Sequence, residues 1–343
     1  MELPRGSRLI PLVEAEGYPV IETEYGRDES WERRAVGELR RIIREEKPDI
    51  VHTHSSLSAR VAAWQCGVPC RFYTRHCAFE PSKKLTSFPG KQANGLMNRV
   101  LSTDIVAVAE AAKKNLTDTG VPEKMITVII NGVEPLRETT PEENGRLKNE
   151  LGIGREDFVC GIVARLEDYK GHAVLLDAAA EVVKSRPGTV FLIVGEGTQE
   201  QLLREQAKRL GIAGNVIFTG FADDVAPYYG IMDLNLNCSW GTETSSLALS
   251  EGMSVGVPAV ASTYGGNPYM ITEGVNGLLV PEKDPEALTA AILKLEGDRD
   301  LLARLSDGAR EMYRTKFTAS AMTRQLETLY EKSAAKHIGN RRG

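Results

Sequence analysis

Short apolar runs alternate with segments of helical periodicity along most of this chain. Residues 31–47 carry apolar side chains at helical spacing, and Pro48 ends that helix before an apolar run at 49–52 that predicts a strand. Further strands are predicted at 71–74, 104–108, 125–130, 159–163, 190–194, 216–218, 234–236, 259–261 and 277–280. Helices are predicted between them, for example at 172–184, 199–210 and 285–295. This alternation predicts an α/β fold with parallel sheets covered by helices on both faces.

The chain is long enough for two domains. Its 343 residues exceed what one compact core usually holds, and a hydrophilic stretch at 134–157 separates two series of predicted strands and helices. We therefore expect Rossmann-like domains at 1–140 and 141–318, and a helical segment at 319–343 that returns toward the first domain. Ligands of such sheets bind beyond the carboxyl ends of the strands, so we expect the site in a central cleft between two facing domains.

Composition and charge narrow the class of protein. The residues are 42% hydrophobic and 26% charged, as in soluble globular proteins, and a net charge of −5 disfavours nucleic acid as a partner. No apolar run approaches the roughly 20 residues that span a bilayer, and no signal-peptide pattern is seen, which predicts a cytoplasmic protein. The five cysteines are an odd number, and their spacing with His76 matches no structural zinc pattern, so we expect no disulfide framework and no metal site.

Basic side chains gather in one part of the predicted first domain. Residues 51–100 hold seven of them against one acid, Glu80: Arg60, Arg71, Arg75, Lys83, Lys84, Lys91 and Arg99. A solvated surface is one interpretation. The other is a face for an anionic acceptor or a lipid surface, which would give the protein a peripheral contact at the inner face of a membrane.

Two glutamates flank or interrupt an apolar helix in the predicted second domain. Glu251 shares a helical face with Leu247 and Val255, and a carboxylate there is costly unless donors such as sugar or ribose hydroxyls meet it. Glu243 precedes this helix, beside a polar run, Thr244, Ser245 and Ser246, that is typical of an N-cap. The amides of that first turn would point the same way as Glu243, so we expect a pocket for a polyhydroxylated, negatively charged ligand.

Two cations follow a predicted strand of the same domain. Arg165 and Lys170 stand five residues apart where that strand ends and a helix begins, and a diphosphate is a natural ligand for a guanidinium fork and an ammonium. Lys170 as a solvated helix residue is the alternative. Gly265, Gly266 and Asn267 precede another helix start and supply either a second anion-binding turn or an ordinary turn.

Other candidates follow strand ends. Gly195, Gly197 and Phe221 stand after two predicted strands and would form a wall for a nucleotide base, although tight turns at strand ends explain each motif better when it is taken singly. In the first domain, His52 and His54 follow one strand and Arg75 and His76 end the next, so His76 and Arg75 would face the cleft. A structural or merely exposed histidine is the alternative.

Taken together, these segments resemble the retaining glycosyltransferases of family 4, also called glycosyltransferase group 1, which have the two-domain GT-B fold. The resemblance covers the chain from about residue 7 to the C-terminus. The shared marks are Asp49-Ile-Val-His-Thr-His54, Thr74-Arg-His76, Val128-Ile-Ile-Asn-Gly-Val133, Arg165 with Lys170-Gly171, Val194-Gly-Glu-Gly197, the Glu243 and Glu251 pair with seven residues between them, and Asn276-Gly-Leu-Leu-Val-Pro281.

The resemblance implies a hexosyl transfer from a nucleotide-diphosphate sugar, UDP-linked ahead of GDP-linked, to a polysaccharide or lipid-linked acceptor. It implies that Glu243 and adjoining amides hold the sugar hydroxyls, Glu251 the ribose, and Arg165 with Lys170 the departing diphosphate, without a metal or cofactor. It further implies that His76 contacts the donor sugar, and that the leaving phosphate helps to deprotonate the acceptor in a same-face reaction.

The chain departs from the family pattern in two places. Tyr269 stands where many members carry an acid, and the chain opens at Met1-Glu-Leu-Pro-Arg-Gly without the family's first strand, glycine-rich loop and helix. We therefore expect an incomplete first domain. A nucleotide-sugar-binding remnant without transfer activity, and a GT-B nucleotide-sugar epimerase, remain alternatives. Spacing does not identify the base, the sugar, the acceptor or the oligomeric state.

Overall fold

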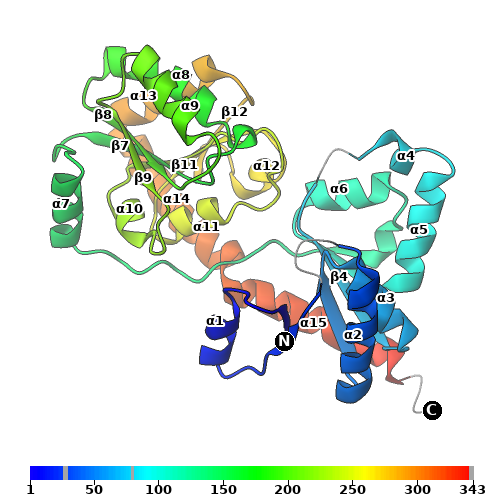
Figure 1. Cartoon of the computed structure of the whole chain (residues 1–343). Helices are drawn as coiled ribbons and strands as arrows, with labels where there is room; N and C mark the ends of the chain where they lie inside the picture. Colours follow the sequence, from blue (N-terminus) through cyan, green and yellow to red (C-terminus); the bar gives the residue numbers. More distant parts are fainter. Residues whose placement is uncertain (26–29, 79–80, 340–343) are drawn as a thin grey trace. The chain divides into compact units, whose positions relative to one another are not determined.

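The computed structural model in Figure 1 describes residues 1–25, 30–78 and 81–339. It divides into two compact units: unit 1 comprises Met1–Ile129 and Arg324–Gly343, and unit 2 comprises Ile130–Thr323. Unit 2 therefore begins earlier in the chain than the expected boundary after residue 140. Each unit has the parallel α/β architecture that the alternating pattern predicts.

Unit 2 contains a six-stranded sheet whose order is β12-β11-β10-β7-β8-β9, with parallel neighbours throughout. Its strands are β7 (Phe158–Val163), β8 (Thr189–Val194), β9 (Val216–Gly220), β10 (Leu234–Asn237), β11 (Ala259–Ser262) and β12 (Gly277–Val280). The strand order runs outward in one direction from β7 and in the other from β10. The boundary between β7 and β10 is thus the switch point at which open α/β sheets bind their ligands.

Helices cover both faces of this sheet because its strands are apolar on both sides. Phe158, Cys160 and Ile162 of β7 belong to one core cluster, whereas Val159 between them belongs to another. Figure 1 shows α8 (His172–Ser185), α9 (Glu200–Arg209) and α13 (Pro285–Gly297) grouped on one side. The remaining helices of unit 2 are α7 (Pro141–Glu150), α10 (Ala226–Gly230), α11 (Leu247–Ser254), α12 (Asn267–Met270) and α14 (Arg299–Met312).

The hydrophilic stretch that the sequence suggests as a boundary contains a folded helix, α7. Its N-terminus is a capping box, in which the Thr140 hydroxyl accepts from the Glu143 amide and the Glu143 carboxylate accepts from the Thr140 amide. Leu147 and Leu151 pack against the second core cluster of unit 2. The stretch therefore belongs to unit 2 and is not a linker. Its capping box and these two apolar side chains hold α7 in place.

Unit 1 is built on a four-stranded parallel sheet of order β3-β4-β5-β6: β3 (Ile50–His54), β4 (Cys70–Arg75), β5 (Asp104–Ala107) and β6 (Ile126–Val128). Its helices include α2 (Arg33–Glu46), α3 (Leu57–Gln65), α4 (Lys83–Thr86), α5 (Gly90–Leu101) and α6 (Glu110–Asp118). A separate pair of parallel strands, β1 (Glu2–Pro4) and β2 (Ile21–Thr23), brackets α1 (Ile10–Ala15). This strand pair was not predicted from the sequence, because strands of three residues are too short to show a periodicity.

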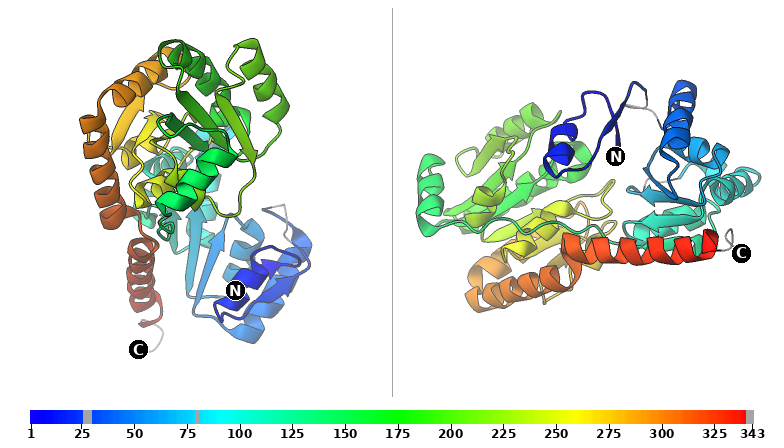
Figure 2. Two further views of the ribbon diagram at one scale, coloured as in Figure 1. Left: turned by 90° about the vertical axis from the view of Figure 1, so that its left-hand side faces the viewer. Right: turned by 90° about the horizontal axis from the view of Figure 1, so that it is seen from below.

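The last helix, α15 (Ala319–His337), matches the predicted C-terminal helix, and Figure 2 shows it in red as one uninterrupted rod. Its residues from Arg324 onward belong to unit 1. There the Ser333 hydroxyl donates to Asp104 Oδ2 at 2.6 Å, and the Tyr330 hydroxyl bonds to the ring of His52. The C-terminal part of α15 therefore packs as part of unit 1.

Candidate functional site

A cavity of about 820 Å³ opens at the carboxyl ends of β7, β8 and β10 in unit 2. Its wall combines residues that follow β7 and β8 with residues that follow β10 and belong to α11. The cavity therefore lies at the switch point of the sheet, which is where sequence reasoning expects a ligand of this domain. Nine of the predicted site residues of this domain line its wall, among them Arg165, Lys170, Gly195, Gly197, Glu243 and Glu251. Phe221, Ser245 and Ser246 lie there as well.

Lys170 forms an ion pair with Glu243 inside this cavity. The distance from Lys170 Nζ to Glu243 Oε2 is 2.9 Å, and the two side chains are 19% and 8% exposed. Lys170 ends a short 3-10 turn, Asp168–Lys170, and Gly171 follows it with φ +77°. A Cβ on Gly171 would lie 2.0 Å from the Cys238 carbonyl, so only glycine lets this turn approach the end of β10. Gly171 thereby brings the ammonium within reach of the carboxylate.

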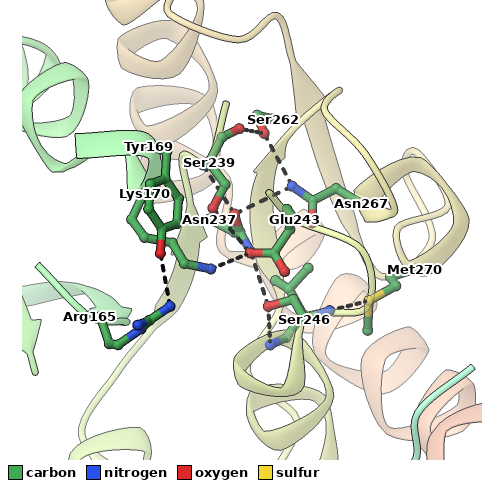
Figure 3. Close-up of polar contacts among 11 residues, drawn as sticks. Arg165, Tyr169, Lys170, Asn237, Ser239, Glu243, Ser246, Ser262, Asn267 and Met270 are labelled. Atoms are coloured by element: carbon green, nitrogen blue, oxygen red, sulfur yellow. Dashed lines mark hydrogen bonds and ion pairs between the residues drawn. The ribbon is translucent and has the colours of Figure 1, made fainter. Parts of the chain in front are cut away.

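The buried carboxylate of Glu243 is satisfied by further donors (Figure 3). Besides Lys170, Asn237 Nδ2 lies 3.4 Å and Ser239 Oγ 3.1 Å from Glu243 Oε2. Asn267 Nδ2 in turn donates to Ser262 Oγ at 3.1 Å, and Ser262 Oγ donates to the Ser239 carbonyl at 2.5 Å. These bonds compensate the desolvation of the carboxylate and fix its position.

The Gly265-Gly266 turn packs against the backbone that carries Glu243. A Cβ on Gly266 would lie 1.5 Å from the Thr244 carbonyl oxygen, and one on Gly265 would lie 1.9 Å from that of Glu243. Asn267 is fully buried, and neither it nor Thr244 or Gly266 is part of the cavity wall. Sequence reasoning predicts donor contacts for all three; the structure places them behind Glu243, and direct contact with a donor stays a prediction.

Arg165 is the exposed cation of the cavity. It follows β7, and its NH2 group donates to the Tyr169 hydroxyl at 2.8 Å. The Tyr169 carbonyl accepts from the Trp240 amide at 2.9 Å, so Tyr169 links the two sides of the site. Sequence reasoning missed Tyr169, although an aromatic residue between two cations at this spacing was a readable signal.

Glu251 lies on α11, where burial alters the pKa of its carboxyl. Burial raises the pKa of its carboxyl above the usual range, while the neighbouring Tyr229 hydroxyl works against that shift. Ser246 caps α11, as the polar run before the helix predicts, because its hydroxyl accepts from the Leu249 amide at 3.4 Å. Asn237 Nδ2 also donates to Ser246 Oγ at 3.0 Å, which ties the cap to the Glu243 network.

The glycines of the opposite wall are required by close backbone packing. A Cβ on Gly195, whose φ is +139°, would lie 2.1 Å from the Ala164 carbonyl, and one on Gly197 would lie 2.4 Å from that of Leu166. The loops that follow β7 and β8 therefore touch through their backbones. Phe221 stands beside them with 60% of its surface exposed, which leaves an aromatic face available to a base.

The predicted histidines of unit 1 form a stack of their own. His54 Nδ1 lies 2.7 Å from His76 Nε2, and the rings of His52 and His54 stack at 4.7 Å. Burial and the neighbouring His54 lower the pKa of His76, and burial with the two other histidines lowers that of His52 to about 3. Arg75 donates to the Cys77 carbonyl and to Asn115 within the same unit. A contact of His76 with a donor stays a prediction.

The parts of the chain that the structure describes contain neither a cluster of side chains arranged for a metal ion nor a helix that could span a membrane. Within these parts, no group of three or more His, Cys, Asp or Glu side chains is arranged to hold a metal ion. Over the same residues, no helix has the length and apolar character needed to cross a bilayer. All five cysteines are free thiols.

Comparison with known families decides the class of this protein. Residues 7–137 match Glycosyltransferase Family 4, and residues 143–312 match the family of glycosyl transferases group 1. The chain carries the two domains of a glycosyltransferase. The two matches meet close to the junction of the two units, and the second includes the whole wall of the cavity.

Relatives and solved structures agree with this assignment. The chain is 28% identical to the UDP-Gal:alpha-D-GlcNAc-diphosphoundecaprenol alpha-1,3-galactosyltransferase of Escherichia coli, over 85% of this chain and 77% of that protein. It is 27% identical to the alpha-monoglucosyldiacylglycerol synthase of Acholeplasma laidlawii, over 84% and 77%. Its fold matches Anabaena Alr3699/HepE, solved in complex with UDP, with a TM-score of 0.84, 23% identity, and coverage of 96% of this chain and 92% of that one. The fold is therefore GT-B, with two Rossmann-like domains.

Proposed function

We propose that this glycosyltransferase is a retaining enzyme that moves a hexosyl group from a UDP-linked sugar to a polysaccharide or lipid-linked acceptor. The observation that carries the proposal is that Arg165 and Lys170 line the cavity of unit 2 together with Glu243 and Glu251, which are two of the four glutamates in its wall. A nucleotide-diphosphate sugar needs this combination, because its diphosphate calls for cations and its sugar and ribose for hydrogen-bond acceptors.

Arg165 and Lys170 would stabilise the diphosphate as its bond to the anomeric carbon breaks. Charge develops on the leaving phosphate oxygens in that step, and fixed cations in a partly desolvated cavity act most strongly on such charge. Lys170 is only 19% exposed and is already fixed by Glu243, so little reorganisation is needed. In this proposal the two side chains supply the electrostatic stabilisation that a metal ion supplies elsewhere.

Glu243 and Glu251 would recognise hydroxyl groups. Glu243 is fixed by its donors and would accept from hydroxyls of the transferred sugar, while Glu251 on α11 would accept from the ribose. Phe221, with its exposed ring, would lie against the base. The retaining course, in which the leaving phosphate takes the acceptor's proton on the same face, is supported by the motif pattern shared with family 4.

The choice of donor and acceptor is supported by the relatives. The Escherichia coli relative is named for a UDP-linked galactose and a diphosphoundecaprenol-linked acceptor. The Anabaena protein of the same fold was solved with UDP-glucose. In this proposal the enzyme works in the cytoplasm, and at the inner face of the membrane when its acceptor is lipid-linked.

The test is transfer from a panel of UDP-, GDP- and ADP-linked hexoses to an undecaprenyl-diphosphate-linked sugar, with the anomeric configuration of the product read by NMR. We expect UDP-sugars to be used and the configuration to be retained. Glu243→Gln should lower turnover, whereas Glu181→Gln, at an exposed ion pair on α8, should not. Inversion, or full activity of Glu243→Gln, would overturn the proposal.

A further inference from the structure

Helix α5 of unit 1 turns most of its large apolar side chains toward solvent. Two of its three buried residues are small or polar and the third is Leu101: a Cβ on Gly95 would lie 2.3 Å from the Gly120 carbonyl, and Asn98 is only 4% exposed. Asn98 Oδ1 accepts from Arg60 NH2 at 2.7 Å, and Asn94 Nδ2 donates to the Thr119 carbonyl at 2.7 Å. The helix is therefore held in unit 1 by hydrogen bonds, close backbone approach and the buried Leu101, whereas its other large apolar side chains are not used for that purpose.

Leu96, Met97 and Val100 of α5 face solvent, as do Leu85 of α4 and Phe88 between the two helices. Of the sixteen exposed large hydrophobic side chains in the described parts of the chain, five fall between residues 85 and 100: Leu85 at 41%, Phe88 at 82%, Leu96 at 63%, Met97 at 36% and Val100 at 38%. We call this surface the α4–α5 face. Such a concentration on two consecutive helices marks an interaction surface, because exposed apolar residues of soluble proteins are normally scattered.

The charges around the α4–α5 face have one sign. Lys83 and Lys84 belong to α4 and Lys91 and Arg99 to α5, and residues 81–103 contain no Asp or Glu. None of the four has an ion-pair partner among the residues that the structure describes. The other three basic residues of the 51–100 stretch, Arg60, Arg71 and Arg75, instead donate hydrogen bonds inside unit 1.

A cavity beside α5 adds a place for a phosphate. It measures about 310 Å³ and is lined by Lys91, Gln92, Gly95, Leu96, Arg99 and Gly120. Lys91 and Arg99 are the charged residues of its wall, which contains no carboxylate. Leu96 belongs both to this wall and to the exposed apolar side chains of the α4–α5 face. The cavity thus offers an anionic head group a site next to side chains that suit acyl chains.

We propose that the α4–α5 face docks unit 1 onto an anionic lipid surface, with Phe88 and Leu96 at the acyl boundary and Lys83 and Lys84 on lipid phosphates. Interleaved apolar and basic side chains are the pattern of a peripheral membrane surface. A second copy of the chain fits less well, because two such faces would oppose like charges. The inference uses no residue of the donor cavity, so it stands or falls independently of the proposed transfer reaction.

The experiment is sedimentation of the full chain with vesicles of phosphatidylcholine alone, or of equal parts phosphatidylcholine and phosphatidylglycerol. We expect binding to the anionic vesicles only, weakened by added salt. Lys83→Gln with Lys84→Gln should weaken binding about 5-fold per lysine, and Phe88→Ala about tenfold. Matched controls are Lys208→Gln with Arg209→Gln, and Leu202→Ala, all exposed on α9, which should bind as the wild type does.

Several results would overturn the proposal. These are no binding to anionic vesicles, equal binding to neutral ones, or α4–α5 variants that bind like their α9 controls. An acidic protein as the true partner would appear as absence of vesicle binding. A second copy as the partner would appear as dimers in analytical ultracentrifugation that Phe88→Ala disperses.

Discussion

The ammonium of Lys170 lies 2.9 Å from the carboxylate of Glu243 in the cavity of unit 2. The pair couples the two kinds of recognition that a sugar nucleotide requires, because one partner is suited to phosphate and the other to hydroxyl groups. Each partner also holds the other in place. Loss of either side chain should therefore affect recognition of both parts of the donor.

Lys170→Ala should lower kcat about 100-fold, because it removes a fixed cation from the charge that develops on the leaving diphosphate. Asn237 and Ser239 still donate to Glu243, so the fold should survive, and a thermal melt checks this. The control is Lys184→Ala, which removes a lysine from an exposed ion pair on α8. Steady-state transfer kinetics provide the measurement, and an unchanged kcat would refute the role of Lys170.

Glu251 should make nucleotide affinity depend on pH. Burial raises the pKa of its carboxyl, so protonation begins at a higher pH than for an ordinary glutamate. Only the carboxylate accepts from both ribose hydroxyls, and UDP affinity should fall as the pH is lowered through that raised pKa. Calorimetric titration of UDP at several pH values measures this. In Glu251→Gln the affinity should be lower and nearly independent of pH over the same range, and a wild-type slope in the variant would contradict the assignment.

Gly266→Ala should destabilise unit 2 and disturb the position of Glu243. The new Cβ would lie 1.5 Å from the Thr244 carbonyl, so the two backbones must move apart, at a cost of about 1–3 kcal/mol. Gly214→Ala is the matched control, since its Cβ would meet nothing within 4 Å. Denaturant titration should separate the two variants, and UDP-sugar binding should weaken only in the first. Equal behaviour would show that the turn does not support Glu243.

His172 should make unit 2 less stable in mild acid. It is 1% exposed, neither ring nitrogen has a hydrogen-bond partner among the described residues, and burial followed by the charge of Lys170 lowers its pKa to about 4. The unfolded histidine takes up a proton near pH 6.5, so its neutral form favours folding above that pH. This contribution, roughly 3 kcal/mol, is lost as the pH falls from 6.5 toward 4.

His172→Leu should remove that part of the pH dependence. Denaturant titration in a Trp31→Phe, Trp64→Phe background reports on unit 2, because Trp240 is then its fluorophore and the two replaced side chains are about half exposed. The variant should keep its free energy of unfolding between pH 6.5 and 4 better than the parent. Parallel pH profiles would show that His172 does not titrate as its burial requires.

Local pattern was enough for most of the fold. The helix predicted at 172–184 is α8, His172–Ser185, and the strand predicted at 277–280 is β12, Gly277–Val280. These elements are long or strongly apolar, so periodicity decides them. The glutamate pair and the two cations were also readable, since charged residues at strand ends and on an apolar helix face conflict with a purely structural role.

Contacts between distant segments were not readable. Nothing near Gly266 in the sequence indicates that it supports Thr244, because the two meet only when β11 pairs beside β10. The sequence alone did not show which of the seven basic residues of the 51–100 stretch are buried and which are exposed. Burial separates Arg60, which is 6% exposed, from Lys83 and Lys84 at the surface. The apolar stripe of α5 was likewise invisible as an exposed surface, because periodicity alone predicts that such a stripe faces the core.

In the proposed reaction, Arg165 and Lys170 bind the diphosphate of a sugar nucleotide in unit 2. Calorimetric titration with UDP and with uridine tests it most directly, on the wild type and on Lys170→Ala. We predict that UDP binds the wild type much more tightly than uridine does, and that Lys170→Ala loses most of this difference while its uridine affinity is unchanged. Equal affinities for UDP and uridine in the wild type, or an undiminished preference in the variant, would contradict the account.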